Sequence, residues 1–246
     1  MRRILLGTAI TLTMLACLPA AIAETTMGAG LRDSLVTQDS LDRLSVGFDY
    51  LRIKRDIKFT GEYGTEQVRA DAYSVYAGYD TMEWLTVFVT AGSVTLKDMA
   101  DDMFDDNGPK WSLGVNANLW HMNITDPAFI KGQCSVGIIA EYGEYAISDS
   151  GSKIDVNDTF AALAVSYEIF AEDMDNMETY PYSLRLFAGP AYSSWQGSLM
   201  AYGENASFKA DTNTGAVGGA DVYLAHNLSL GCHVHYFGSS TVNAML

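Results

Sequence analysis

The chain has 246 residues, which suits a single all-β domain once a leader peptide is removed. Its 30 acidic residues outnumber its 15 basic residues and give a formal net charge of −15, which excludes nucleic acid as a partner bound through phosphate contacts. Hydrophobic residues form 48% of the chain, yet no run of about 18 of them beyond the leader predicts a transmembrane helix.

The N-terminus has the pattern of a secretory signal peptide. Arg2 and Arg3 precede an apolar stretch over residues 4–18, and Ala21-Ile22-Ala23 has the A-x-A form of a cleavage site. We therefore expect residues 1–23 to be removed near Ala23. A lipid anchor on Cys17 is the alternative, but the preceding residues place a bulky Leu where a small residue is usual.

Residues 24–40 are polar and are expected to form a flexible leader or a short plug, ahead of a domain that covers residues 41–246. In this domain, apolar and polar residues alternate along short segments separated by turn signals. The clearest segment is 110–120, where Trp111 and Leu113 share one face and Lys110 lies on the other. Alternation with period two is typical of a strand between two different environments.

Nine such segments are readable along the chain, in order. They cover about 43–50, 68–79, 85–92, 110–120, 134–145, 158–169, 182–193, 211–224 and 228–236. A short tenth strand at Thr241 to Leu246 would bring the chain back to the side where it started. Because bacterial single-chain barrels have even strand numbers, we predict an all-β, antiparallel, up-and-down transmembrane β-barrel of ten strands, with eight as the alternative.

Glycine indicates which face of these strands lines the interior. Eight glycines fall on the more polar face, namely Gly47, Gly92, Gly114, Gly137, Gly189, Gly215, Gly219 and Gly231. On a strand face exposed to water, glycine lowers the stability of the strand and makes no compensating packing contact. Inside a narrow barrel, glycine leaves room for the larger side chains of neighbouring strands. We therefore assign the polar face to the lumen and the apolar face to lipid. The alternative is a soluble barrel with glycines at bulges.

Aromatic residues on the apolar face cluster near the strand ends. Tyr182 and Tyr192 are ten residues apart on one strand, which is ~25 Å along the axis of a barrel tilted by about 40°. Two aromatic girdles at membrane interfaces have this spacing. One girdle is expected to contain Tyr50, Trp111, Tyr142, Tyr192 and Tyr236, and the other Tyr79, Trp84, Tyr167 and Tyr182.

The face assigned to the lumen carries charges of both signs beside large residues. The expected polar and charged set is Arg43, Asp49, Lys110, Glu141, Glu168, Arg185, Asp221, His233 and His235. Buried charges must be paired or solvated, so we predict an ion-paired lumen filled by side chains that carries little or no steady current. Longer polar loops at about 96–109, 147–156 and 197–208 fall on one side, which faces outward in such barrels.

One stretch resembles a known family. The run Tyr76-Ala77-Gly78-Tyr79-Asp80, followed by Met82-Glu83-Trp84-Leu85-Thr86-Val87-Phe88, resembles the small outer-membrane β-barrel proteins of Gram-negative bacteria, of the porin-like or opacity type. The opening Leu44-Ser45-Val46-Gly47-Phe48-Asp49-Tyr50 is similar to their first strand. The resemblance implies a place in the bacterial outer membrane. It also implies outer-membrane lipid, lipopolysaccharide and the outer-membrane assembly machinery as partners.

Signals for catalysis and for metal binding are weak. His233 and His235 point toward the expected lumen, but the sequence places no nucleophile or orienting acid beside them. The acidic loop at 101–108 lacks calcium-loop spacing. We therefore expect no catalytic, metal-binding or cofactor-binding residues.

Cys134 and Cys232 fall on non-neighbouring strands, too far apart for a disulfide.

The sequence thus favours a non-enzymatic outer-membrane barrel, monomeric, with a structural or surface-interaction role. Two alternatives remain. One is a narrow passive, porin-like channel for small solutes. The other is an outer-membrane enzyme that uses the lumen histidines.

Overall fold

The computed structural model describes residues 43–61, 64–97, 107–124, 132–149, 151–170, 183–201, 204–225 and 228–245. Within these residues the protein is all-β, with eleven strands in one antiparallel sheet. The strands are β1 (Leu44–Phe59), β2 (Thr65–Met82), β3 (Leu85–Lys97), β4 (Asn107–Ile124), β5 (Gly132–Asp149), β6 (Ser152–Phe170), β7 (Ser183–Ala201), β8 (Glu204–Ala210), β9 (Thr214–Ala225), β10 (Leu228–Phe237) and β11 (Ser239–Met245). This described part holds no helix long and apolar enough to cross a membrane.

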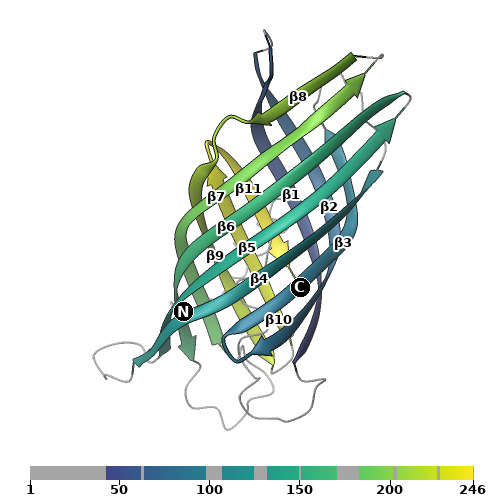
Figure 1. The fold of residues 1–246 in the computed structure, drawn as a ribbon. Coiled ribbons are helices and arrows are strands. Elements are labelled where there is room, and N and C mark those ends of the chain that lie inside the picture. The colour runs from purple at the N-terminus through teal and green to yellow at the C-terminus, as the bar shows by residue number, and fades with distance from the viewer. Residues whose placement is uncertain are drawn as a thin grey trace, which may run out of the picture.

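The sheet closes on itself. Strands β1 to β7 pair in chain order, β9 follows β7, and β11 pairs back onto β1. Figure 1 shows the strands wrapped around a common axis, with β8 at the upper end. Strands β8 and β9 follow one another along the same edge of β7, so the ring has ten strand positions at its lower end.

The ring narrows toward its upper end. There β8 pairs directly with β1, through Ile57 opposite Ala210 and Phe59 opposite Phe208, and closes a circuit of eight strands from β1 to β8. The β10–β11 hairpin stops below this level because it turns at Gly238, whose φ of +81° suits glycine. The lower end of the closed sheet therefore has the predicted number of ten strands. The upper end has eight strands, the number given as the alternative.

The short last strand forms as expected. Thr241 and Val242 pair with β10, and Val242 to Met245 pair with β1. Strands β2 and β3 are joined by a tight turn, since β2 ends at Met82 and β3 begins at Leu85. Other expectations lie outside the described residues. These are the signal peptide, the leader at 24–40, Tyr182, Leu246 and the acidic loop up to residue 106.

Two predicted loops are wrong. The segment 147–156 is a hairpin in which β5 and β6 stay paired as far as Asp149 and Ser152. The segment 197–208 is also paired, between the end of β7 and β8. Strand β4 likewise continues to Ile124, past the predicted end of its segment. The polar stretches 147–156 and 197–208 resembled loops because apolar and polar residues exchange faces there.

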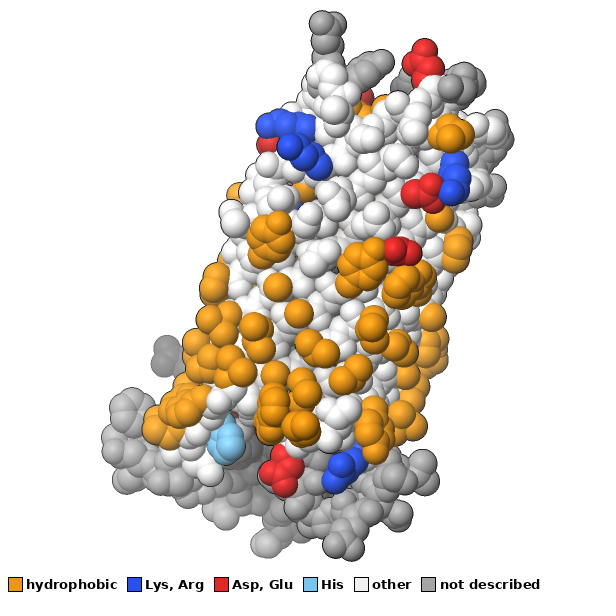
Figure 2. Space-filling view, in the orientation of Figure 1, with side chains coloured by type: hydrophobic (Ala, Val, Ile, Leu, Met, Phe, Trp, Pro, Cys, Tyr) orange, Lys and Arg blue, Asp and Glu red, His pale blue; other side chains and the backbone are white. Residues whose placement is uncertain are grey.

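The sheet reverses its polarity along its length, and β1 shows this clearly. In the lower half, Val46 and Phe48 are exposed while Asp49 is buried. In the upper half, Arg52 and Lys58 are exposed while Leu51, Ile53 and Ile57 are buried. Figure 2 shows the hydrophobic side chains gathered on the lower part of the visible face, with charged side chains above them and a few at the lower border.

The upper half therefore has an apolar core inside a polar exterior, as a soluble protein would. Fifteen buried residues form this upper core: Leu51, Ile53, Ile57, Val68, Ala70, Ala72, Val94, Leu96, Tyr145, Ile147, Ile154, Val156, Trp195, Phe208 and Ala210. In the lower half the exterior is apolar instead, and the interior contains charged as well as apolar side chains.

Candidate functional site

Most of the expected lumen residues lie on the inner side of the closed sheet. Seven of the nine are buried: Asp49, Lys110, Glu141, Arg185, Asp221, His233 and His235. Glu168 and Arg43 are half-buried, and Arg43 directly precedes β1. The period-two pattern thus placed these side chains on one face, and closure of the sheet brings that face inward.

A lower cluster of charges forms around Arg185. The register sets Arg185 on β7 opposite Glu168 on β6 and Asp221 on β9. Arg185 interacts with both carboxylates and hydrogen-bonds the Tyr223 hydroxyl. Asp221 also pairs with His233, with 2.8 Å between Oδ1 and Nε2. The cluster therefore pairs buried charges of both signs, as burial requires.

A second cluster lies farther up the interior, around Arg55. This residue donates to the Ser193 hydroxyl and, over 3.4 Å, to the Thr212 carbonyl, while its guanidinium lies 4.2 Å from the centre of the Phe237 ring. Ser193 in turn donates to Asp158 over 3.1 Å. Arg55 was not expected because the predicted first strand ended at residue 50. Arg55 is an even number of residues after Asp49 and therefore lies on the same face of β1. Extending the alternation beyond residue 50 predicts that Arg55 faces the interior.

The interior between the clusters is closely packed. A cavity lined by Lys110, Glu141, Asp158 and Phe160 has a volume of about 10 Å³, room for roughly one water molecule. Phe160 stacks on His235 with 4.8 Å between ring centroids. Ten buried residues form this inner apolar layer: Tyr76, Phe88, Ile139, Phe160, Ala162, Ala164, Phe187, Ala191, Val217 and Phe237. Among the described residues, aromatic and charged side chains fill this level of the interior.

Interior glycines provide the space for these large side chains. A Cβ on Gly114 would lie 2.2 Å from Phe88 Cζ, and one on Gly219 would lie 2.8 Å from both Phe187 Cζ and His233 Cδ2. Both distances are too short for real contacts, so the aromatic side chains lie against bare backbone. This arrangement is the one expected from glycines on the lumen face.

The lower exterior is a band of exposed large apolar side chains. It contains Leu44, Val46, Phe48, Tyr73, Val75, Tyr79, Met82, Trp84, Val89, Trp111, Leu113, Val115, Leu119, Trp120, Met122, Ile138, Tyr142, Leu163, Val165, Leu186, Tyr192, Leu230, Val234 and Tyr236. These residues come from β1 to β7, from β10 and from the β2–β3 turn. We call this set the apolar band.

The residues expected in the aromatic girdles mostly point outward. Tyr79, Trp84, Trp111, Tyr142, Tyr192 and Tyr236 are exposed, and Tyr50 and Tyr167 are half-buried. Three further exposed aromatic residues were not included in the expected girdles: Phe48, Tyr73 and Trp120. Trp120 points outward because a register shift between Asn118 and Trp120 changes the parity of β4, which a regular alternation does not reveal.

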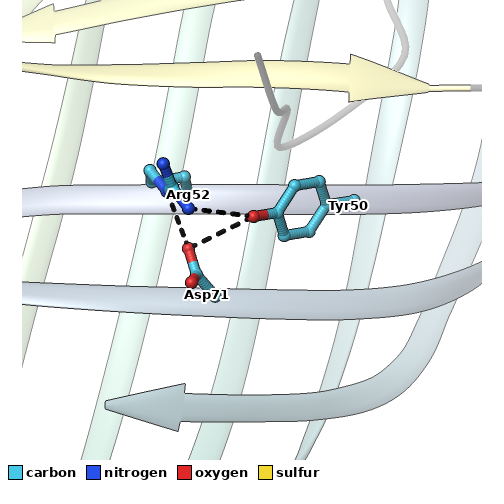
Figure 3. A network of polar contacts seen from close by, with 3 residues as sticks. All are labelled: Tyr50, Arg52 and Asp71. Atoms are coloured by element: carbon cyan, nitrogen blue, oxygen red, sulfur yellow. Dashed lines mark hydrogen bonds and ion pairs between the residues drawn. The ribbon is translucent and has the colours of Figure 1, made fainter. Parts of the chain in front are cut away.

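A polar cluster lies on the exterior at the upper border of the apolar band (Figure 3). Arg52 Nε donates to Asp71 Oδ1 over 2.9 Å, and Arg52 Nη2 donates to the Tyr50 hydroxyl over 3.2 Å. Tyr50 stacks on Tyr73 with 4.5 Å between ring centroids. The hydrogen bond to Asp71 raises the pKa of Arg52 above its usual value, so the guanidinium remains charged.

The described residues contain no group of three or more His, Cys, Asp or Glu placed to hold a metal ion. Cys134 and Cys232 lie on β5 and β10, which do not pair, and both thiols are free.

No protein-family model and no curated protein matches this chain.

Proposed function

We propose that this protein is a transmembrane β-barrel of a Gram-negative outer membrane, with the apolar band in contact with lipid. The apolar band carries the proposal, because it covers the exterior of β1 to β7 and β10 of a closed sheet whose interior holds charged side chains. A large exposed apolar surface is unfavourable in water and marks a contact with lipid or protein. Apolar residues outside and polar residues inside are the pattern of membrane barrels.

The proposal includes the cellular context that the family resemblance implies. A signal peptide at residues 1–23 directs export, and the assembly machinery of the outer membrane inserts the chain as a monomer. Lipid and lipopolysaccharide then surround the apolar band. The upper half, with its polar exterior, projects on the side of the extended hairpins, which is the outward side in such barrels.

A structural or surface-interaction role suits this architecture better than transport. Barrels of about eight strands enclose just enough space for side chains, whereas open porins have 16 to 18 strands. Here the interior contains two charged clusters, an apolar layer and the upper core in succession. The charges therefore serve to fill and pair the interior rather than to line a solute path.

Burial also disfavours an enzyme that acts through the interior histidines. The His233 side chain is 1% exposed, and Phe187 packs against it with 4.8 Å between ring centroids. A general base must reach the proton that it removes from a substrate. His233 and Asp221 therefore act as a buried structural pair in this proposal.

Electrical recording separates these roles. The purified, refolded chain is first floated with phosphatidylcholine vesicles to demonstrate insertion, and is then added to planar bilayers. We expect the protein to float with the vesicles and to produce no stable current steps, because side chains fill the interior. Stable steps on the nanosiemens scale from inserted protein would favour the channel instead. Protein that stays with the aqueous fraction would contradict the membrane proposal.

A further inference from the structure

A groove lies on the exterior of the upper half of the sheet, over β6, β7 and β8. It has a volume of about 390 Å³ and follows two neighbouring rows of cross-strand partners. Each of the six residues in these rows is exposed or half-buried. We call this feature the polar groove, because hydroxyl, amide and charged side chains meet along it. The first row is Asn157, Gln196 and Lys209, and the second is Asp155, Ser198 and Ser207.

The floor of the polar groove offers hydrogen-bond donors and acceptors that the protein itself does not use. Within the described residues, the side chains of Gln196, Ser198 and Ser207 make no hydrogen bond. Asn157 Oδ1 accepts from the Tyr142 hydroxyl over 3.3 Å, and no described residue accepts from Asn157 Nδ2. Each of these amides and hydroxyls can both donate and accept. A ligand that carries many hydroxyl groups can therefore bind several of them at once.

The charged side chains around the polar groove are of both signs. Asp155 Oδ2 accepts from Lys153 Nζ over 2.7 Å. Lys58 on β1 is the cross-strand partner of Lys209, and Lys58 forms an ion pair with Asp211. Binding of a strongly charged ligand requires an excess of the opposite charge. The balance of charges here therefore favours a ligand that carries no net charge.

The first row continues onto a pair of exposed aromatic residues. Asn157 is opposite Glu144 on β5, and Glu144 is opposite Trp111 on β4. The charge of Glu144 is opposite to that of Lys209 at the other end of the row. Trp111 packs against Tyr142 with 6.0 Å between ring centroids, and the Tyr142 hydroxyl donates to Glu144 Oε1 over 2.5 Å. The row from Trp111 to Lys209 crosses four strand spacings, which is ~19 Å.

We propose that the polar groove and this aromatic pair bind an uncharged oligosaccharide of a polysaccharide that is anchored in the same membrane. The amides and hydroxyls match the hydroxyl groups of sugar units, and the Trp111 ring offers an apolar face to their C–H groups. The site faces sideways at the upper border of the apolar band, so a polysaccharide that leaves the lipid beside the barrel passes it. The inference rests on the proposed membrane location.

An oligosaccharide array tests the class of ligand. The full chain is refolded in a phosphocholine detergent, which has no sugar headgroup. It is applied to immobilised neutral hexose and N-acetylhexosamine oligosaccharides, and to sialylated and phosphorylated counterparts of the same chains. We expect some neutral oligosaccharides to retain the protein, and their acidic counterparts to retain it less well. Failure of every neutral oligosaccharide to bind, or a preference for the acidic counterparts, would overturn the inference.

A double variant tests the polar groove with the oligosaccharide that binds best. Asn157→Ala with Gln196→Ala removes two amides from the floor and is expected to weaken binding about tenfold. The matched control is Asn123→Ala with Gln133→Ala, which removes the same two groups from the lower ends of β4 and β5. This control is expected to bind like the wild type. Equal losses in the two double variants would exclude the polar groove as the binding site.

The aromatic pair is tested by a matched pair of substitutions on β4. Trp111→Leu is expected to weaken binding, because it removes the ring next to Glu144. Trp120→Leu removes an equally exposed ring elsewhere on the same strand and is expected to leave binding unchanged. Full binding by Trp111→Leu would show that the aromatic pair takes no part in the site.

The source of the oligosaccharide is tested in phosphatidylcholine vesicles, after flotation has shown whether the chain inserts. If it does not insert, the proposed function fails together with this inference. If it inserts but binds no neutral oligosaccharide, only the inference fails. The best-binding oligosaccharide, linked to a lipid in the same vesicles, is expected to bind at a lower total concentration than its free form, because anchoring raises its local concentration. Binding of the free form alone would contradict a membrane-anchored source.

Discussion

At the scale of single residues, two adjacent glycines on β9 have opposite surroundings. A Cβ added to Gly219, on the interior face, would lie 2.6 Å from the Cys232 carbonyl oxygen and 2.8 Å from Phe187 and His233 side-chain carbons. A Cβ added to Gly218, on the exterior face, would meet its nearest neighbour at 3.4 Å. The chain thus contains its own matched pair for testing how tightly the interior is packed.

We predict that Gly219→Ala destabilises the protein by about 1–3 kcal/mol, the usual cost of overpacking a well-packed interior. Gly218→Ala is expected to have little effect or to stabilise slightly, because alanine restricts the unfolded chain more than glycine does. Urea titration of the refolded protein in detergent measures both. Equal effects at the two positions would mean that the interior is loosely filled.

The interior charges show what can be predicted residue by residue. Asp49, Lys110 and Arg185 were identified because their parity along a strand fixes their face. Their partners were not identified, because pairing depends on the register between strands that are distant in sequence. The interaction of Arg55 with Ser193, 138 residues later in the chain, illustrates this limit.

At the scale of strands, the upper ends of β5 to β8 are held together by an apolar core inside the closed sheet. Trp195 is the largest fully buried side chain there, and it packs against Tyr145 and Phe208 with centroid distances of 6.1 and 5.6 Å. The neighbouring outward residues of β7, Ser194 and Gln196, are polar. This part of the sheet therefore resembles a soluble protein in its energetics.

We predict that Trp195→Ala costs about 3–5 kcal/mol, in the range of large-to-small substitutions in protein cores. The cost is expected to be similar in detergent and in lipid vesicles, because the upper core does not depend on the membrane. Hydrogen exchange should speed up at the upper ends of β5 to β8 and remain slow in their lower parts. A loss of protection spread evenly over the whole sheet would contradict a separate upper core.

Apolar and polar residues exchange faces halfway along the strands, and this exchange explains why only about half of each strand was predicted from the sequence. The segments recognised on β1 and β3 ended near residues 50 and 92, whereas the strands continue to Phe59 and Lys97. Alternation persists beyond those points, but its two faces exchange polarity. A pattern that requires one face to remain apolar therefore stops at the border of the apolar band. The polar hairpins beyond it resemble loops.

At the scale of the whole molecule, the change from ten strand positions to eight accompanies the change of interior. The wider lower end holds the Arg185 cluster and the inner apolar layer, the Arg55 cluster lies near the junction of β8 and β9, and the narrower upper end holds the upper core. Strand number sets the space that a closed sheet encloses. Because the β10–β11 hairpin is short, β8 pairs directly with β1 above it and closes the sheet there. No local pattern in the sequence predicted this pairing.

Membrane contact can be measured directly with spin labels at two outward positions of β7. In a background of Cys134→Ser and Cys232→Ser, labels replace either Leu186 in the apolar band or Gln196 in the upper half, both exposed and ten residues apart on one strand. The chain is reconstituted in phosphatidylcholine vesicles, and collisions with oxygen and with a water-soluble nickel complex are compared. We predict that the label at position 186 collides mainly with oxygen, as in lipid, and that the label at position 196 collides mainly with the nickel complex. Access of the nickel complex to both labels would contradict the assignment of the apolar band to the membrane.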